Sequence, residues 1–478
     1  MPARGLLVCV ALVLAGCAVV SLGCGSSDPD SPPSTATPAE TGTSTAVTPT
    51  ATETPTPSPT AVTASPEPAT ATTPPTATPV KDMDDEALAA DLAERVLASV
   101  REEFGEAAEA LTAHAFPLGE GDEQGALWAV VSNGAQPAYV DEDGNVINFF
   151  HFVALYRRNA DATWSEALDT LTLETAPQRV DVEVQDTGPR RARGSAPLIV
   201  MRGGTGAHSG TLDVVIVEGE RLRTAVSHIS ARPGAGDIAD LDGDGVFELI
   251  LNSSNPYVFC YACAVEERSE LVYRWDGVEY SAVTIEAPED LEGNLAEGAR
   301  RVARLAEANL WREAGALAVE TSRGAPEHEG LRWLSIAVNR TATLRLAYAG
   351  SAGQPLLTNV LAGEYGAAYA LMQALPPEEA FALDGPLISG TAAETDLPTM
   401  VAYLLFYADE ALKVRDDDPA IHAVRALGQV LASPDELSRA RSSIGRALRL
   451  APDDLFLQQA EAYLDSIDVA PGAASDER

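Results

Sequence analysis

The spacing of apolar residues divides the chain into parts with different periods. In residues 84–103 apolar side chains recur every four positions, at Leu88, Leu92, Val96 and Val100, which predicts one amphipathic helix. The period then changes to two, which is typical of β-strands, and near residue 289 it changes back to long Ala- and Leu-rich helical runs. The pattern predicts a multidomain chain, with a β domain in 81–288 followed by a helical domain in 289–467.

Three similar units make up the predicted β domain. Each contains an apolar strand, a loop, an alternating second strand, a tight polar turn and a third strand, and the units recur about every 60 residues. In the third unit the turn is Asp276-Gly277, a dipeptide that favours a tight hairpin between alternating strands. The predicted strands are 127–131, 151–156 and one from Trp164; 198–201, 212–217 and 222–229; and 248–251, 271–275 and 280–285.

The recurrence indicates antiparallel, blade-like sheets, but a closed propeller needs about four blades. Either the segment after the first helix forms a fourth sheet, or the sheets form an open layered domain. We expect an incomplete, propeller-like β domain.

The helical part resembles tetratricopeptide repeats most closely in residues 421–454. The positions that match the packing residues of such a repeat are Leu427, Gly428, Leu431, Ala440, Ile444, Ala447 and Pro452. Similar spacing of second-helix residues recurs at Ala314, Ala318, Thr321 and Pro326; at Tyr365, Ala367, Leu371 and Ala374; and at Leu404, Ala408 and Ala411. This resemblance implies an α-solenoid of about four helical hairpins. An irregular bundle is the alternative, because segments 351–357 and 380–398 break the period.

The first 24 residues have the layout of a secretory signal. Arg4 precedes a short apolar run that ends in Leu14-Ala15-Gly16-Cys17, and the run is too short to span a bilayer. This ending resembles the lipobox of bacterial lipoproteins, which implies that Cys17 is acylated and anchors the protein at the extracytoplasmic face of a bacterial cell membrane. Cys24, after Ser21-Leu22-Gly23, is the alternative lipidation site, and an ordinary signal or an uncleaved anchor also stays open.

The amino-acid composition predicts a stalk after the signal, and the net charge argues against some classes of partner. Residues 25–80 consist mostly of Thr, Pro, Ala and Ser, which predicts a disordered, extended linker, and residues 468–478 are expected to be a disordered tail. The formal net charge of −39 argues against nucleic acid and anionic lipid headgroups as partners. Membrane binding is therefore expected through the lipid anchor alone.

One acidic loop has the spacing of a calcium site. Asp240, Asp242 and Asp244 would supply carboxylates at positions one, three and five, Val246 its carbonyl and Glu248 a ninth-position ligand. The loop resembles those of FG-GAP and VCBS-type propeller repeats, which implies a structural Ca²⁺ ion that joins two strands of a blade. A metal-free hairpin turn is the alternative. Residues 141–145 form a weaker copy, which we interpret as a turn.

Two further candidates lie in loops. Cys260 and Cys263 are expected to form a disulfide in an oxidising compartment; a thioredoxin-like redox pair, or a zinc site that includes His228, are alternatives. The glycine-rich loop 202–210 is interpreted as a connection between strands in which His208 or Ser209 contacts a ligand.

These features favour a non-catalytic binding or scaffold lipoprotein over an enzyme. The expected partner is another envelope or extracellular protein, bound by the helical domain. The alternative is an extracytoplasmic solute-binding protein or enzyme, with a pocket in the loops near His208, Asp240 and Cys260. A redox protein that uses the two cysteines is a third possibility.

Overall fold

The computed structural model describes most of the chain after residue 84. The described residues are 85–104, 111–118, 125–134, 139–140, 146–147, 151–159, 161–175, 177, 179–185 and 196–468. Within these ranges no helix combines the length and the apolar character needed to cross a membrane. The predicted signal and stalk, with Cys17 and Cys24, lie outside the described residues, as do the turn at 141–145 and residues 469–478 of the predicted tail.

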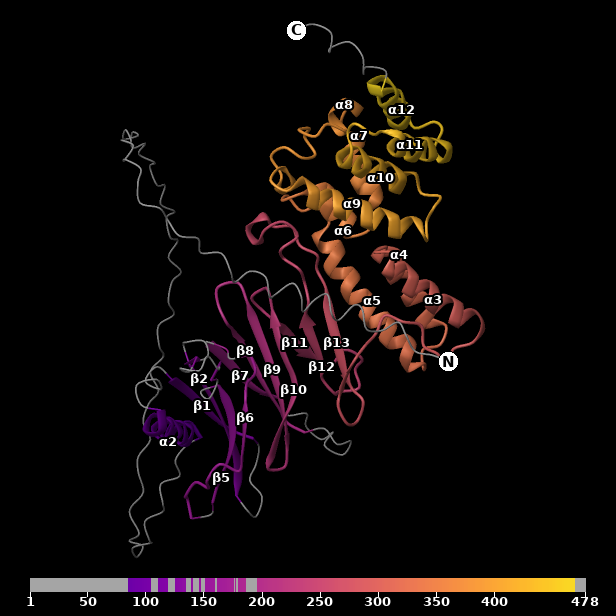
Figure 1. Cartoon of the computed structure of the whole chain (residues 1–478). Coiled ribbons are helices and arrows are strands. Elements are labelled where there is room, and N and C mark those ends of the chain that lie inside the picture. The colour runs from indigo at the N-terminus through magenta and orange to yellow at the C-terminus, as the bar shows by residue number, and fades with distance from the viewer. Residues whose placement is uncertain are drawn as a thin grey trace, which may run out of the picture. The chain divides into compact units, whose positions relative to one another are not determined.

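The β region consists of three four-stranded sheets in which each strand pairs with its neighbours in an antiparallel direction (Figure 1). Sheet 1 contains β1 (Leu111–Pro117), β2 (Ala126–Gly134), β5 (Phe152–Arg158) and β6 (Asp169–Thr172). Sheet 2 contains β7 (Arg179–Gln185), β8 (Leu198–Gly204), β9 (Gly210–Glu218) and β10 (Arg221–Ser230). Sheet 3 contains β11 (Gly236–Ala239), β12 (Glu248–Asn252), β13 (Glu270–Trp275) and β14 (Tyr280–Ala282). A two-stranded ribbon, β3 (Tyr139–Val140) with β4 (Val146–Ile147), lies between β2 and β5 in the sequence.

Alternating side chains make sheets 1 and 2 each part of two hydrophobic cores. On β9, Val215 and Val217 face a core shared with sheet 1, whereas Leu212, Val214 and Ile216 face a core shared with sheet 3. Sheet 2 is therefore buried on both faces, which explains the nearly continuous apolar run of β9. The amphipathic helix α2 (Asp85–Phe104) covers the other face of sheet 1, where Leu92 and Val96 pack with Trp128.

The sheets confirm the predicted strand regions but contain strands that the sequence pattern did not reveal. Each sheet begins with an additional strand: β1, β7 or β11. The segment after α2 supplies β1 to sheet 1 instead of forming a fourth sheet, and none of the three sheets closes. The last strand of sheet 1, β6, starts at Asp169 and not at Trp164 as predicted, because Trp164 forms only an isolated bridge to Arg158.

The helical region follows the sheets, as predicted. Its α-helices are α3 (Gly293–Glu307), α4 (Trp311–Arg323), α5 (Glu329–Tyr348), α6 (Pro355–Leu361), α7 (Tyr365–Gln373), α8 (Pro377–Ala380), α9 (Leu397–Leu412), α10 (Pro419–Ala432), α11 (Ser438–Leu450) and α12 (Leu455–Asp468). Two 3₁₀ turns, η3 (Tyr261–Cys263) and η4 (Ala392–Glu394), complete the described helical elements. Side-chain caps begin several helices: the Asp396 carboxylate accepts a bond from Thr399 N at 3.3 Å, and Asp418 accepts one from Ala420 N at 2.8 Å.

Small buried residues bring neighbouring helices together. Ala314 and Ala318 of α4, Ala408 and Ala411 of α9, and Ala440 and Ala447 of α11 are all buried. In α7 the predicted position is displaced by one residue, because Ala367 is exposed and Ala368 is buried.

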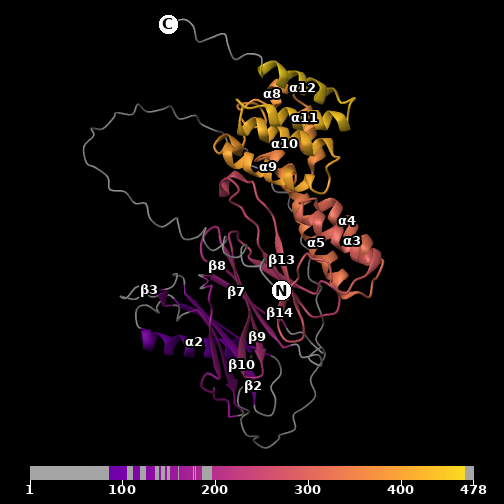
Figure 2. The ribbon, with the colours of Figure 1, turned by 45° about the vertical axis from the view of Figure 1, so that its right-hand side comes forward.

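The β and helical regions share one hydrophobic core. A long hairpin, residues 253–269, extends β12 and β13 and places Val258 and Val265 in the core of the helices. Figure 2 shows β13 beside α5, and both regions belong to one compact unit.

Candidate functional site

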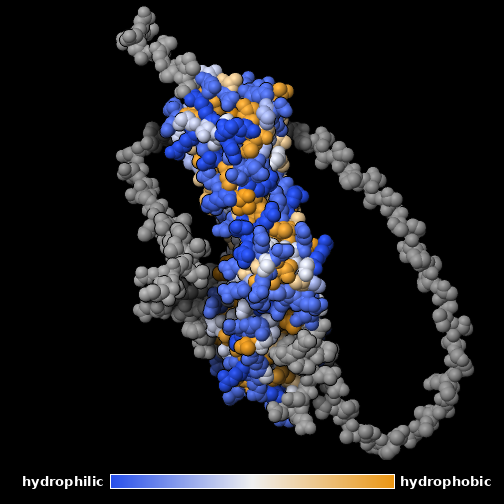
Figure 3. Space-filling model, turned by 90° about the vertical axis from the view of Figure 1, so that its right-hand side faces the viewer, coloured by the Kyte–Doolittle hydropathy of each residue, from blue (hydrophilic) through white to orange (hydrophobic). Residues whose placement is uncertain are grey.

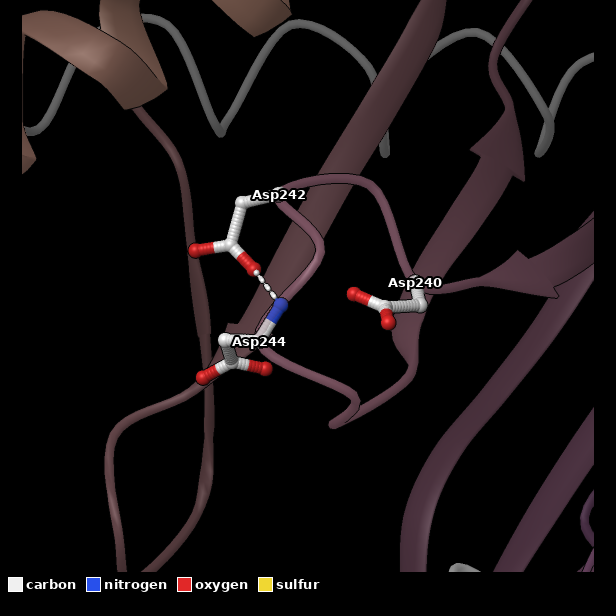
Figure 4. Close-up of side chains that lie close together, drawn as sticks. All are labelled: Asp240, Asp242 and Asp244. Carbon is white, nitrogen blue, oxygen red and sulfur yellow. Dashed lines mark hydrogen bonds between the residues drawn. The ribbon is translucent and has the colours of Figure 1, made fainter.

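The acidic loop between β11 and β12 gathers three carboxylates. Asp240, Asp242 and Asp244 each place one carboxylate oxygen within 4.8 Å of the other two (Figure 4). Hydrogen bonds from backbone N–H groups to the aspartate side chains hold the loop in a tight turn. Asp242 Oδ1 accepts a bond from Asp244 N at 3.1 Å, and Asp244 Oδ1 accepts one from Val246 N at 2.7 Å. Gly243 and Gly245 both have φ near +76°, which permits the tight winding.

Glu248 lies at the neck of this loop and outside the cluster of three. It is buried, and its Oε2 accepts a hydrogen bond from Leu241 N at 2.7 Å. Burial raises the pKa of Glu248 to about 7, and the negative charges of the three aspartates add to the rise. Glu248 thus braces the loop through Leu241 N, and in Val246 it is the N–H, not the carbonyl oxygen expected as a ligand, that bonds to Asp244.

Helix α5 reaches this loop from the helical region. Arg332 Nη2 lies 3.1 Å from Asp242 Oδ2, and the Asp242 side chain is only 4 % exposed. Sequence reasoning did not find this pair, because 90 residues separate its members and no local pattern connects them.

Two more arginines of α5 bind the first residue of β13 and the hairpin that precedes it. Arg340 donates to Glu270 Oε2 from Nε at 2.8 Å and from Nη2 at 2.7 Å. Arg345 Nη2 donates to Glu267 at 3.0 Å, and the Tyr407 hydroxyl donates to the same carboxylate. Burial and the charge of Glu267 raise the pKa of Tyr407 above its ordinary range, so its proton stays in this bond.

The cysteines lie at the tip of the same hairpin. Cys260 and Cys263 form a disulfide around the short turn η3. The bonded sulfurs leave no thiolate for zinc, and His228 Nε2 lies 2.9 Å from the carbonyl oxygen of Asn252. Gly353 lets the helices approach this tip, because a Cβ at that position would lie 2.4 Å from the carbonyl oxygen of Cys263.

The glycine-rich loop borders a groove of about 810 Å³ at the ends of β7, β8 and β11. Ser209 lines the groove, together with Asp181 and Arg202. His208 is not among the residues that line the groove, and its ring packs 4.2 Å from that of Tyr261. The loop and the disulfide hairpin thus meet, whereas the acidic loop contacts α5.

The chain was also compared with known proteins. No protein-family model matches it, and no curated protein does either.

Proposed function

We propose that this protein is a lipid-anchored, extracytoplasmic and non-catalytic binding or scaffold protein of a bacterial envelope. Its β region would be an incomplete, propeller-like stack, and its helices a short solenoid that presents a surface to another envelope or extracellular protein. The Asp240 loop would hold a structural Ca²⁺ ion.

The observation that favours a protein partner is an exposed aromatic side chain on α9. Phe406 is 59 % exposed, and its ring lies 5.1 Å from that of Tyr407, which stacks on Tyr403. Aromatic side chains on a rigid helix contribute strongly to protein interfaces. Figure 3 shows one face of the molecule, on which hydrophobic groups are interspersed among hydrophilic ones.

This proposal is tested by cross-linking the tagged full chain in native membranes and identifying the attached protein. We expect one dominant partner, whose yield falls at least about fivefold in Phe406→Ser. Val278→Ser is the matched control, because Val278 is 75 % exposed but lies in the β13–β14 turn. Equal yields from both variants would contradict a docking role for α9.

Calcium is supported by the chemistry of the loop. Three carboxylates this close repel one another, and oxygen ligands from aspartates suit Ca²⁺. The cation would join the two strands that flank the loop, β11 and β12, and α5 would share in the stabilisation through Arg332.

The lipid anchor is tested on the mature N-terminal peptide. We expect its intact mass to carry acyl chains on Cys17, and Cys17→Ala to release the protein from the membrane fraction. Cys24→Ala is the matched control and should stay bound. Release by Cys24→Ala alone would assign the anchor to Cys24 instead.

A second candidate is a solute-binding protein that uses the groove beside the glycine-rich loop. The groove volume lies within the range of about 300–1,000 Å³ that is typical of small-molecule sites. Ser209, a candidate ligand residue from the sequence, is part of its wall.

A further inference from the structure

Strand β7 leaves one edge of sheet 2 free for pairing. It is the last strand in the order β10-β9-β8-β7, and no other described strand pairs with its outer side. Its seven residues pair with β8 without a shift in register, and they include no proline. In an antiparallel pair, alternate residues direct their N–H and C=O groups away from the partner strand. A regular edge of this kind is a template for a further strand.

Sheet 1 extends beyond β7. Strand β7 contacts β2, whereas β10, at the other edge of sheet 2, contacts β5 and β6. Because β1 pairs with β2 on the side away from β5, β1 lies beyond β7. The two sheets therefore form a step, with the edge of β7 as its wall and the inner face of β1 as its floor.

The inner face of β1 is open and partly apolar. Phe116 and His114 pair with Ala129 and Val131 of β2, which belong to the core between sheets 1 and 2, so their side chains lie on that side of β1. Phe116 is only partly buried, and His114 and Thr112, the next residue on this face, are exposed. A strand added beside β7 would cover these residues with its inward-facing side chains.

The opposite face of β7 is acidic. Asp181 and Glu183 are exposed there, while the valines at 180, 182 and 184 pack toward the core between sheets 1 and 2. Arg202 donates from Nη1 to Glu183 at 2.9 Å and from Nη2 to Asp237 at 2.6 Å, and Asp181 forms no ion pair with any described residue. A cationic side chain opposite Asp181 would therefore be favoured.

Two occupants from the protein itself fit this edge poorly. A second copy that pairs along the whole of β7 in the antiparallel direction would be centred on Val182, so Asp181 of one copy would lie opposite Glu183 of the other. Like charges directly opposite each other destabilise a strand pair. The predicted linker at 25–80 is rich in proline, which cannot donate to a strand, and contains no Lys or Arg. The charges thus favour a basic segment of another protein.

We propose that β7 binds an extended segment of another protein as an additional strand, and that this segment alternates basic with apolar residues. Its main chain would bond to the outer edge of β7, its Lys or Arg side chains would face Asp181, and its apolar side chains would pack on β1. In such strand addition, main-chain bonds supply affinity and alternate side chains supply specificity. The surface is separate from Phe406 of α9, so the inference goes beyond docking at the helices, and each can fail alone.

The test titrates the full chain into a fluorescent peptide of the length of β7, KVRVKVT, and measures anisotropy. We expect a Kd below about 100 µM at low ionic strength. EVEVEVT, which reverses the charges, and KKRVVVT, which has the same composition as the first peptide without its alternation, should each bind at least about tenfold more weakly. Equal binding of KKRVVVT, or no binding of KVRVKVT at about 1 mM, would overturn the proposal.

Methylation of the peptide backbone tests for main-chain pairing. N-methyl groups on one alternate set of residues remove the N–H groups that would bond to β7, whereas N-methyl groups on the other set leave those N–H groups in place. We expect one methylated peptide to lose binding and the other to retain it. Equal affinities of the two methylated peptides would contradict strand addition.

Asp181→Lys locates the site. Asp181 is exposed, so the fold should be unaffected, while the affinity for KVRVKVT should fall at least about tenfold. Asp453→Lys is the matched control, because it makes the same change in net charge at an exposed residue between α11 and α12 and should bind as wild type does. Unchanged affinity in Asp181→Lys would place the peptide elsewhere and overturn the proposal.

Sedimentation of the full chain tests the competing occupant. Without peptide we expect a monomer, because self-pairing of β7 opposes like charges. A dimer that KVRVKVT dissociates would show that a second copy covers β7, and it would overturn the assignment of this edge to another protein.

Discussion

Asp213 shows how one buried residue links stability to pH. It lies on β9, is 1 % exposed, and accepts hydrogen bonds from the hydroxyls of Thr175 and Ser227. Burial raises the pKa of Asp213 above its ordinary value of 3.8, although the two hydrogen bonds oppose the rise. The folded protein therefore holds this proton more tightly than the unfolded chain does.

The sign of the pH effect follows from this difference. A raised pKa stabilises the fold at pH values below 3.8, and that contribution is lost as the pH rises through the folded-state pKa. We predict that wild type loses free energy of unfolding relative to Asp213→Asn as the pH rises from about 4 to 7. Urea unfolding of both proteins across this pH range measures the difference in their free energies of unfolding, with chelator present so that metal binding does not contribute. A constant difference between the two proteins would contradict the raised pKa.

The contacts of the candidate sites that the sequence did not predict join residues that lie far apart in the chain. The three aspartates lie within five residues, and the two cysteines are three apart, so local spacing sufficed to name them as candidates. The groove could not be predicted from local spacing. The sequence identified Ser209, but it gave no sign that Asp181 and Asp237 approach Arg202 from separate strands.

Helix α5 is the element that joins the two regions. Arg332, Arg340 and Arg345 lie along one helix and bind acidic groups of sheet 3 and its loops. In a chain with a net charge of −39, these arginines neutralise carboxylates of sheet 3 and its loops that face the helical region. The ion pairs therefore fix how α5 packs on sheet 3.

Substitution of Arg345 tests whether the ion pairs of α5 hold the helical region to sheet 3. Its side chain is 8 % exposed, it also donates to the Leu361 carbonyl oxygen at 3.1 Å, and its loss would leave the Glu267 carboxylate only partly compensated. We predict that Arg345→Met lowers the free energy of unfolding by about 2–4 kcal/mol, as measured by urea unfolding. Arg345→Met combined with Glu267→Gln should recover part of the loss, because no buried charge is then stranded.

The matched control is Arg312→Met. Arg312 pairs with Glu364 at 2.8 Å, but its side chain is 64 % exposed, so its removal should cost only about 0–1 kcal/mol. Equal losses from the two variants would show that α5 is not specially bound to the hairpin.

The strands missed from the sequence share a physical cause. The β7 segment alternates well, with Val180, Val182 and Val184 facing the core, but it follows no turn signal comparable to Asp276-Gly277. The β11 strand has four residues and starts at Gly236, which is too short for a period of two to be recognised. Each is an edge strand whose pairing depends on the strand that follows it, so neighbours in space determine its conformation.

At the scale of the whole molecule, the hairpin and α5 make the sheets and helices one structure. The helical core includes Val258 and Val265 of the hairpin, and the disulfide tip packs against Gly353. A cation in the Asp240 loop would therefore stabilise a body that contains both regions, since Asp242 also binds Arg332. Calcium binding and global unfolding should be linked.

The thermal unfolding of the full chain with and without calcium tests this account most directly. After chelation, addition of about 1 mM Ca²⁺ should raise the Tm by about 5 °C or more, while Mg²⁺ has little effect. Asp244→Asn should lose most of that rise, and Asp453→Asn, which removes an exposed aspartate between α11 and α12, should keep it. An unchanged Tm in wild type, or the same rise in Asp244→Asn, would contradict a calcium ion in the Asp240 loop.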